Sequence, residues 1–452
     1  MNYNNNDIII AQSTPIGSSA IAVIRVSGKS LSDFVFQLNN KKHIKPRYNY
    51  KIEFKGFGSN KLIDTCVMVY YKAPKSFTGE DLLEVSCHGN SIIVEQIINE
   101  FIAQGVRLAY PGEFSYRAFK NNKIDLMQAE SIAAKISANT DTYGAALQNM
   151  ENGTVSQQLK KLKSVVLNTM TIIEHELDFN EDEITHLKTK KIITQFQTIK
   201  NDLALILARS NNIQKINQGY RVVIIGLPNA GKSTLFNKII GHDRAIVTPI
   251  KGTTRDVLEA TIKIKNIPFT FYDTAGYRKT DDMIEALGIN KGFLALKGAD
   301  IVLLVDETGP QKLLKTLVKD GFVAQGSQVV CVKTKCDAVS SVDVLKNKTL
   351  QISSKKNVGI NQLLTHLFTC LDNGVEKNSS SNVVLCNERQ LNLIKQGQLI
   401  IDEILKELGL GAPMDIISSE CRSFVEIIEE MLGKISSEEV LNKIFKGFCV
   451  GK

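Results

Sequence analysis

The residues that most clearly indicate chemistry lie in GLPNAGKS at positions 226–233, which fits the phosphate-binding pattern G-x-x-x-x-G-K-[ST] in full. The strand-like run RVVIIG leads into it and a helical pattern follows, which is the context that the motif requires. In such a loop, backbone N–H groups hold phosphates; we expect Lys232 to reach the β- and γ-phosphates and Ser233 to bind Mg²⁺. The nucleotide contacts expected from this loop are Asn229, Ala230, Gly231, Lys232, Ser233 and Thr234.

Segments further along the chain indicate that the nucleotide is GTP. In TKCD, at 334–337, the Asp337 carboxylate can accept hydrogen bonds from guanine N1 and N2, and adenine presents no such donor pair. The order and spacing of GTTRD, DTAG, TKCD and SSK are typical of a translation-factor-type GTPase. Thr254 offers Mg²⁺ a second hydroxyl and senses the γ-phosphate, and Asp273 would hold Mg²⁺ through water. The further expected contacts are Thr248, Pro249, Ile250, Lys251, Gly252, Thr253, Thr254, Asp273, Thr274, Ala275, Gly276, Thr334, Lys335, Asp337, Ser353 and Ser354.

One position departs from the usual guanine motif N-K-x-D. Thr334 stands where that motif has an asparagine, whose longer side chain normally braces the phosphate-binding loop. Lys335 and Asp337 remain, so we expect guanine selection to survive with a lower nucleotide affinity.

The residues also bear on how GTP is cleaved. Tyr277 follows DTAG, where Ras-type enzymes have a water-orienting glutamine. The Asn229 amide, together with carbonyl groups of the long TPIKGTTRD segment, can hold a monovalent cation that supplies the charge of an arginine finger. Glu285 could orient water indirectly, but its position taken alone favours a solvated helix residue.

Composition places the chain among ordinary globular proteins and suggests about three domains for its 452 residues. The net charge of +8 fits a nucleic-acid partner or a genomic bias toward lysine and asparagine. Eight scattered cysteines without a CxxC pair disfavour a zinc site and fit a reducing compartment. We expect a cytoplasmic protein, because the sequence shows neither a signal peptide nor an 18-residue apolar span.

The elements that position these residues fall into three kinds. Residues 1–120 are expected to form an α+β domain, with strands at 20–28 and 62–71. Helical patterns cover 121–216 and 377–452, and alternating strands and helices over 217–376 indicate a mostly parallel sheet. The predicted fold class is therefore multidomain: an α+β N-terminal domain, a helical bundle domain, and an inserted α/β P-loop GTPase (G) domain. Two separate helical domains are the alternative.

The sequence closely resembles the MnmE (TrmE) family of tRNA modification GTPases over essentially its whole length. That family has the same domain order, with a folate-binding N-terminal domain through which it dimerises. The motifs that carry the resemblance are STPIGSSAIAVIRVSG, SFTGEDLLEVSCHGN, PGEFSYRAFKNNKIDLMQAE, GLPNAGKSTLFN, AIVTPIKGTTRDVL, DTAGYR and FCVGK.

The resemblance implies a K⁺-stimulated enzyme that converts GTP to GDP. With an FAD-dependent partner of the MnmG (GidA) type, usually as a heterotetramer, such enzymes modify carbon 5 of the wobble uridine of certain tRNAs. The added group is carboxymethylaminomethyl or aminomethyl. Its one-carbon unit comes from a tetrahydrofolate, 5,10-methylene or 5-formyl, and its amine comes from glycine or ammonium.

The resemblance also implies roles for individual residues. Glu285 matches the family's water-orienting glutamate, which reverses the residue-only interpretation, and it would act with Lys232 and Thr254. Tyr277 and Lys251 depart from the family pattern and put the hydrolysis rate in question. The implied K⁺ ligands are Asn229, Thr248, Ile250 and Thr253, and the implied folate contacts are Arg25, Glu84, Lys123 and Lys452.

Two residues keep more than one interpretation. Cys449 lies close to the folate in the family, where a thiolate could attack a carbon or take part in redox, but it could also merely pack beside Phe448. His88 in SCHGN has no evident proton-transfer partner in the sequence, and we expect a structural role for it.

Two other functions compete with tRNA modification. A ribosome-assembly switch would share the GTPase motifs, but we find no GXXG clamp after 375 and no aromatic RNA-binding strand. A scaffold with a decayed GTPase is disfavoured by Lys232, Ser233, Asp273 and Glu285, whereas Thr334 leaves it some room.

Overall fold

The computed structural model describes residues 7–39, 44–178, 189–242, 258–273, 298–311, 314, 327–337, 345–346, 349–370, 384–434 and 437–451. The chain forms two compact units. The first contains Met1–Ser137, Leu147–Leu207 and Val383–Lys452, and the second contains Ala138–Ala146 and Ala208–Asn382. Segments from both sides of the P-loop therefore fold together in the first unit.

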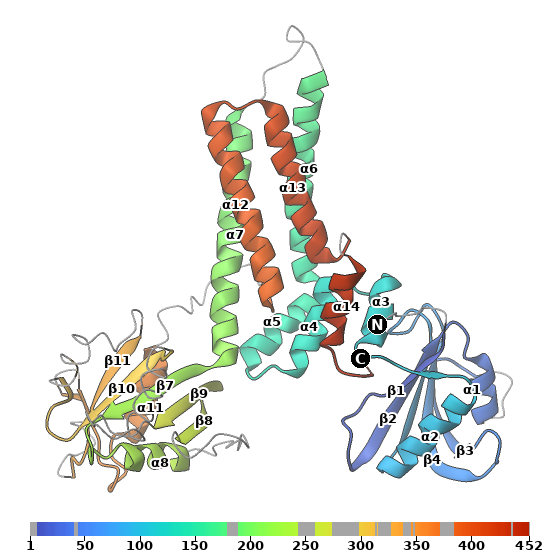
Figure 1. Ribbon diagram of the computed structural model, residues 1–452, viewed down its shortest axis with the longest axis horizontal. Helices are drawn as coiled ribbons and strands as arrows, with labels where there is room; N and C mark the ends of the chain where they lie inside the picture. The colour runs from blue at the N-terminus through green and yellow to red at the C-terminus, as the bar shows by residue number, and fades with distance from the viewer. Residues whose placement is uncertain are drawn as a thin grey trace, which may run out of the picture. The chain divides into compact units, whose positions relative to one another are not determined.

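The first unit begins with a six-stranded sheet of order β3-β4-β5-β2-β1-β6, antiparallel except for the β1–β6 pair (Figure 1). Its strands are β1 (Ile9–Gln12), β2 (Ser19–Gly28), β3 (Asn49–Lys55), β4 (Leu62–Tyr71), β5 (Asp81–Gly89) and β6 (Arg107–Leu108). Helices α1 (Ser32–Asn39) and α2 (Ser91–Ala103) cover one face, because Val35, Ile97 and Phe101 pack into the same core as Ile24 and Val85.

The opposite face of this sheet is covered only in part among the described residues. Helix α3 (Glu113–Lys120) packs Phe114 against Ile9, Ala11 and Leu82. Side chains alternate along strands, so Ile21 and Val67 share this face with Arg25, and both are exposed. An open apolar area therefore adjoins Arg25.

The second part of the first unit is helical and is dominated by four long helices, α6, α7, α12 and α13. They share one core, in which Val166 and Ile173 meet Phe196, Ile401 and Phe424. The helices of this part are α4 (Leu126–Ile136), α5 (Asp141–Glu151), α6 (Thr154–Asp178), α7 (Thr189–Gln218), α12 (Glu388–Leu410), α13 (Met414–Leu432) and α14 (Glu438–Lys446), of which α5 and α7 also enter the second unit.

Local signals define where several of these helices begin and end. The Asp125 carboxylate accepts from the Gln128 N–H and the Gln128 side chain accepts from the Asp125 N–H, so a capping box starts α4. The Asn387 side chain accepts from the Gln390 N–H at the start of α12, and Gly411 ends that helix with φ +71°. These contacts satisfy backbone groups at both ends of α12.

The second unit is built on a seven-stranded sheet of order β12-β13-β11-β10-β7-β9-β8 (Figure 1). Its inner strands are parallel, and β8 and β12 run antiparallel at the two edges. Strand β10 is buried at every position, as expected for a strand covered on both faces. The elements are β7 (Tyr220–Gly226), α8 (Lys232–His242), β8 (Leu258–Ile264), β9 (Ile267–Asp273), β10 (Ile301–Asp306), β11 (Gln328–Lys333), β12 (Leu345–Lys346), β13 (Thr349–Gln351) and α11 (Ile360–Thr369).

The predicted fold class is confirmed: an α+β N-terminal part, a helical part and an α/β unit with a P-loop are all present. The three predicted boundaries, at 120/121, 216/217 and 376/377, remain predictions. None of the described helices is long and apolar enough to span a membrane.

Candidate functional site

The P-loop connects the end of β7 to the start of α8. Asn229 (φ +60°) and Gly231 (φ +87°) adopt the left-handed conformation that curls the loop. The buried ammonium group of Lys232 donates hydrogen bonds to the carbonyls of Gly226 (3.2 Å) and Leu227 (3.1 Å). Gly226 must be glycine, because a β-carbon there would lie 2.0 Å from the Val305 carbonyl oxygen. The loop thus holds the positively charged Lys232 ammonium group at the place where phosphates would bind.

A carboxylate and a hydroxyl lie next to this lysine. Asp273 ends β9 and is buried, and among the described residues its Oδ1 has no hydrogen-bond partner. Burial raises the pKa of Asp273, although the Ser233 hydroxyl and the Lys232 charge act in the opposite direction. Burial lowers the pKa of Lys232. An unpaired buried carboxylate oxygen beside a serine hydroxyl suits Mg²⁺, which prefers oxygen ligands and retains water.

The base-recognition segment lies at the end of β11. A pocket of about 450 Å³ is lined here by Glu307, Thr308, Gln351 and residues 333–337. The Ser353 hydroxyl donates to Asp337 Oδ1 at 2.6 Å, and Lys335 pairs with Glu307 at 2.5 Å. The Asp337 carboxylate is therefore oriented by Ser353, which the sequence also predicts to lie at the nucleotide site.

Thr334 still braces the P-loop, despite its short side chain. Its hydroxyl donates to the Ala230 carbonyl at 2.6 Å, and its backbone N–H donates to the Asp306 carbonyl at 3.0 Å. The brace consists of one side-chain hydrogen bond, where an asparagine amide could form more. The expected lower affinity stays a prediction, but the P-loop and the base segment are physically joined.

Several predicted residues lie outside the part of the chain that the structure describes. Of the remaining ones, Thr234 lines a further pocket of about 570 Å³ together with Asn237, Lys238, Gly241 and Asn357. Ser354 follows Ser353 in the turn after β13. The residues outside the described ranges are Thr248, Pro249, Ile250, Lys251, Gly252, Thr253, Thr254, Thr274, Ala275, Gly276, Tyr277, Glu285 and Lys452.

A second polar cluster lies on the N-terminal sheet. Arg25 of β2 and Glu84 of β5 are cross-strand partners, and Arg25 Nε donates to Glu84 Oε1 at 2.8 Å. Tyr71, which the sequence analysis missed, donates its hydroxyl to Glu84 Oε2 at 3.3 Å. Burial and the Glu84 charge raise the pKa of Tyr71, so this hydroxyl stays a proton donor. Two predicted folate residues are thus in direct contact.

Lys123 does not contact the Arg25–Glu84 pair but lies beside a neighbouring loop. Its ammonium group donates to the Pro74 carbonyl at 3.0 Å, and no hydrogen bond to Arg25 or Glu84 is found among the described residues. Pro74 belongs to the loop that also carries Phe77, whose ring centroid lies 6.0 Å from the Arg25 guanidinium carbon. Lys123 therefore supports the loop beside Arg25.

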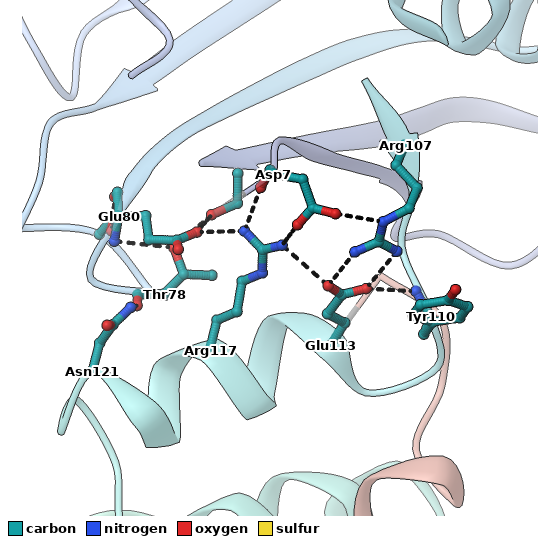
Figure 2. Close-up of polar contacts among 10 residues, drawn as sticks. Asp7, Thr78, Glu80, Arg107, Tyr110, Glu113, Arg117 and Asn121 are labelled. Atoms are coloured by element: carbon teal, nitrogen blue, oxygen red, sulfur yellow. Dashed lines mark hydrogen bonds and ion pairs between the residues drawn. The ribbon is translucent and has the colours of Figure 1, made fainter. Parts of the chain in front are cut away.

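A cluster of buried ion pairs holds this loop and α3 against the sheet (Figure 2). The fully buried Arg117 guanidinium donates to Glu80 Oε2 and Glu113 Oε1, both at 3.1 Å, and to Asp7 Oδ1 at 3.0 Å. Arg107 bridges Asp7 and Glu113. Burial acts to raise the pKa of Asp7, but hydrogen bonding and charge from Arg107 bring it below its ordinary value. The arginines offset the cost of burying these carboxylates.

The C-terminal residues 449–451 contact Arg25 of the N-terminal sheet and Gly112. The Cys449 carbonyl accepts from the Gly112 N–H at 3.2 Å, and the Gly451 carbonyl accepts from Arg25 Nη1 at 3.4 Å. All eight cysteines are described, and Cys449 is the exposed one among them. Burial raises the pKa of Cys66 to about 12 and of Cys87 to about 11. Cys449 is thus the accessible thiol, two residues from an Arg25 contact.

His88 has a partner that the sequence did not reveal. Its Nδ1 lies 2.8 Å from Asp64 Oδ1, and its backbone N–H donates to Asp64 Oδ2. The imidazole is exposed, whereas the Asp64 side chain is only 8% exposed. The carboxylate orients the ring, which fits the expected structural role. Among the described residues, no cluster of three or more potential ligands could hold a metal ion such as zinc.

Known proteins show the same combination of parts. Residues 126–449 match the family profile described as the MnmE helical domain, and residues 8–123 match that of the GTP-binding protein TrmE N-terminus. The tRNA modification GTPase MnmE of Aquifex aeolicus is 33% identical over 449 residues, which covers 98% of this chain and 99% of that protein. This chain belongs to the MnmE family of tRNA modification GTPases.

Another relative agrees with this membership. The tRNA modification GTPase MnmE of Fervidobacterium nodosum is 36% identical over 461 residues, covering 99% of this chain and 98% of that protein. The crystal structure of the G domain of the T. maritima FeoB iron transporter is 24% identical and covers 33% of this chain and 97% of that chain. Its TM-score to this chain is 0.26. Membership of the MnmE family favours tRNA modification over a ribosome-assembly switch.

Proposed function

We propose that this MnmE-family GTPase uses Mg²⁺ and K⁺ to hydrolyse GTP. With an FAD-dependent partner of the MnmG type, it would add a carboxymethylaminomethyl or aminomethyl group to carbon 5 of the wobble uridine of certain tRNAs. A tetrahydrofolate supplies the carbon. The observation that carries the proposal is a P-loop site and an Arg25–Glu84 pair in one chain of this family.

The Mg²⁺ part of the proposal rests on Asp273 and Ser233. Asp273 Oδ1 is buried without a hydrogen-bond partner among the described residues. The Ser233 hydroxyl is hydrogen-bonded to the same carboxyl group. Ser233 would bind the ion directly with Thr254, and Asp273 would hold it through water. The ion would neutralise charge on the β- and γ-phosphates. Lys232 would add a second positive charge.

The K⁺ part rests on Asn229. This residue keeps a left-handed backbone in the P-loop, which places its side chain on the curled part of the loop. We propose that its amide oxygen binds K⁺ together with Thr248, Ile250 and Thr253, and that Glu285 orients the attacking water with Thr254. A cation beside the phosphates stabilises the charge that develops in the transition state.

Hydrolysis is therefore expected to depend on the monovalent cation. GTP turnover should be at least about tenfold faster in KCl than in NaCl of equal ionic strength. Asn229→Ala should abolish this difference, because it removes the amide oxygen. Asn229→Asp keeps an oxygen and tolerates the left-handed backbone, so it should keep part of the response. A wild-type enzyme with equal rates in both salts would contradict the K⁺ proposal, as would an alanine variant that still prefers K⁺.

The folate part rests on the N-terminal cluster. The folate contacts would be Arg25, Glu84, Lys123 and Lys452, because a carboxylate can pair with the donor edge of a pterin and cations can pair with the glutamate carboxylates. Cys449 is an exposed thiol two residues before the Gly451 carbonyl that accepts from Arg25. The exposed Ile21 and Val67 beside Arg25 support a homodimer formed through the N-terminal domains.

We propose the domain arrangement that this function needs. Residues 1–120 would bind folate and dimerise, 121–216 and 377–452 would form the helical domain, and 217–376 would form the inserted G domain. The first unit supports this division, since it contains residues from both sides of the P-loop.

One reconstitution tests the whole proposal. Purified protein is combined with its flavoprotein partner, undermodified tRNA, GTP, KCl and 5,10-methylenetetrahydrofolate, with glycine or ammonium in separate arms. Modified wobble uridine, measured by mass spectrometry of digested tRNA, should appear only when GTP and folate are both present. Modification that persists without folate would reject the carbon source, and no modification in any arm would reject the proposed reaction.

A further inference from the structure

The last residues of the chain lie against the N-terminal sheet beside the Arg25–Glu84 pair. We define the tail as residues 449–451. Its first carbonyl accepts from the Gly112 N–H, and its last, that of Gly451, accepts from both Ser13 Oγ (3.0 Å) and Arg25 Nη1 (3.4 Å). The tail therefore accepts from one donor of Arg25, Nη1, while Glu84 of the sheet accepts from another, Nε.

The position of Gly451 depends on its being glycine. Its φ is +87°, and a β-carbon there would lie 2.5 Å from the Gln12 carbonyl oxygen and 2.9 Å from Ser13 Cα. Both neighbours are backbone atoms at the end of β1, so they cannot move aside as a flexible side chain could. Gly451 is buried, whereas Val450 before it is exposed. Any larger residue at 451 would displace the tail.

Ser13 provides a rigid anchor for this contact. Its backbone N–H donates to the Val23 carbonyl at 2.8 Å, which ties it to β2 two residues before Arg25. The Ser13 hydroxyl, at 3.0 Å, and Arg25 Nη1, at 3.4 Å, therefore donate to the same Gly451 carbonyl oxygen.

The consequence concerns the orientation of the Arg25 guanidinium. Glu84 accepts from Nε and Gly451 accepts from Nη1, while Nη2 makes no hydrogen bond to a described residue. A guanidinium held on two sides keeps its remaining donors in a fixed plane. A ligand then loses less conformational entropy on binding than it would with a freely rotating side chain.

We propose that Ser13 and Gly451 are positioning residues of the folate site: they seat the tail so that the Gly451 carbonyl fixes Arg25 for an anionic or pterin-bearing ligand. This inference rests on the proposed folate function. Neither residue needs to touch the ligand. The helical part of the first unit, from which the tail continues, is thereby joined to the ligand-binding arginine.

The test measures binding of 5-formyltetrahydrofolate to the full-length protein by isothermal titration calorimetry. Gly451→Ala should weaken binding by about tenfold and Ser13→Ala by about three- to tenfold, the range that loss of one orienting hydrogen bond produces. Ser13→Thr keeps a hydroxyl and should bind within about twofold of wild type. Val450→Ala is the matched control in the tail and should also bind within about twofold.

The outcomes distinguish failure of the proposed folate site from failure of the positioning role alone. Wild-type protein that binds no folate overturns the proposed folate site and this inference with it. Wild-type binding together with unchanged affinity in Gly451→Ala and Ser13→Ala overturns the inference alone. If Ser13→Thr binds folate as weakly as Ser13→Ala, the hydroxyl does not position the tail and Ser13 has a packing role. That result would also overturn the inference.

Discussion

Asp337→Asn is expected to reverse the nucleotide preference of this GTPase from guanine to xanthine. Asp337 ends the base-recognition segment, and its carboxylate is oriented by the Ser353 hydroxyl at 2.6 Å. An asparagine amide would point an N–H donor at a guanine donor, which leaves buried groups unpaired, whereas xanthine offers a carbonyl oxygen at that position. We expect GTP affinity to fall by about 100-fold or more, with a gain for XTP.

Binding and hydrolysis of GTP and XTP, measured side by side, check this expectation. Asp141→Asn is a matched control, because Asp141 is exposed and is hydrogen-bonded to Asn266 rather than to the base segment. That control should keep the wild-type preference. Unchanged GTP selectivity in Asp337→Asn would remove Asp337 from the base-recognition site.

Arg117→Met is expected to destabilise the N-terminal sheet more than any surface substitution. The change keeps an apolar stem but leaves Glu80, Glu113 and Asp7 without the shared guanidinium. Breaking a buried ion pair by removing one partner costs about 3–5 kcal/mol. Peptides covering α3 should then lose protection in hydrogen-exchange mass spectrometry. Lys120→Met, at an exposed position on the same helix, should leave protection nearly unchanged.

The same cluster predicts a pH dependence with a defined sign. The pKa of Asp7 is lowered in the folded protein, so its contribution to stability is present above its unfolded pKa and is lost as the pH falls through the folded value. Hydrogen-exchange protection of α3 in the wild-type protein should therefore fall as the pH is lowered. Arg117→Met should weaken this dependence of protection on pH. Equal protection of both proteins across the acid range would contradict a stabilising role for the cluster.

Local patterns determined the elements of this protein. The strand expected at 20–28 is β2 (Ser19–Gly28), and the one expected at 62–71 is β4 (Leu62–Tyr71), because a run of apolar or alternating residues is a property of the segment itself. The P-loop was equally evident, since its glycines and lysine are contiguous and its function depends mainly on its own backbone.

Only the tertiary structure decided how distant residues meet. Thr334 reaches Ala230 across 104 positions, and Arg25 meets both Glu84 and Gly451. The reason is strand register: pairing Arg25 with Glu84 depends on how β2 and β5 are aligned, which alternation within either strand does not encode. The Arg117 cluster likewise joins residues that are far apart in the sequence, from Asp7 to Glu113, and the shared guanidinium offsets the cost of burying Glu80 and Glu113.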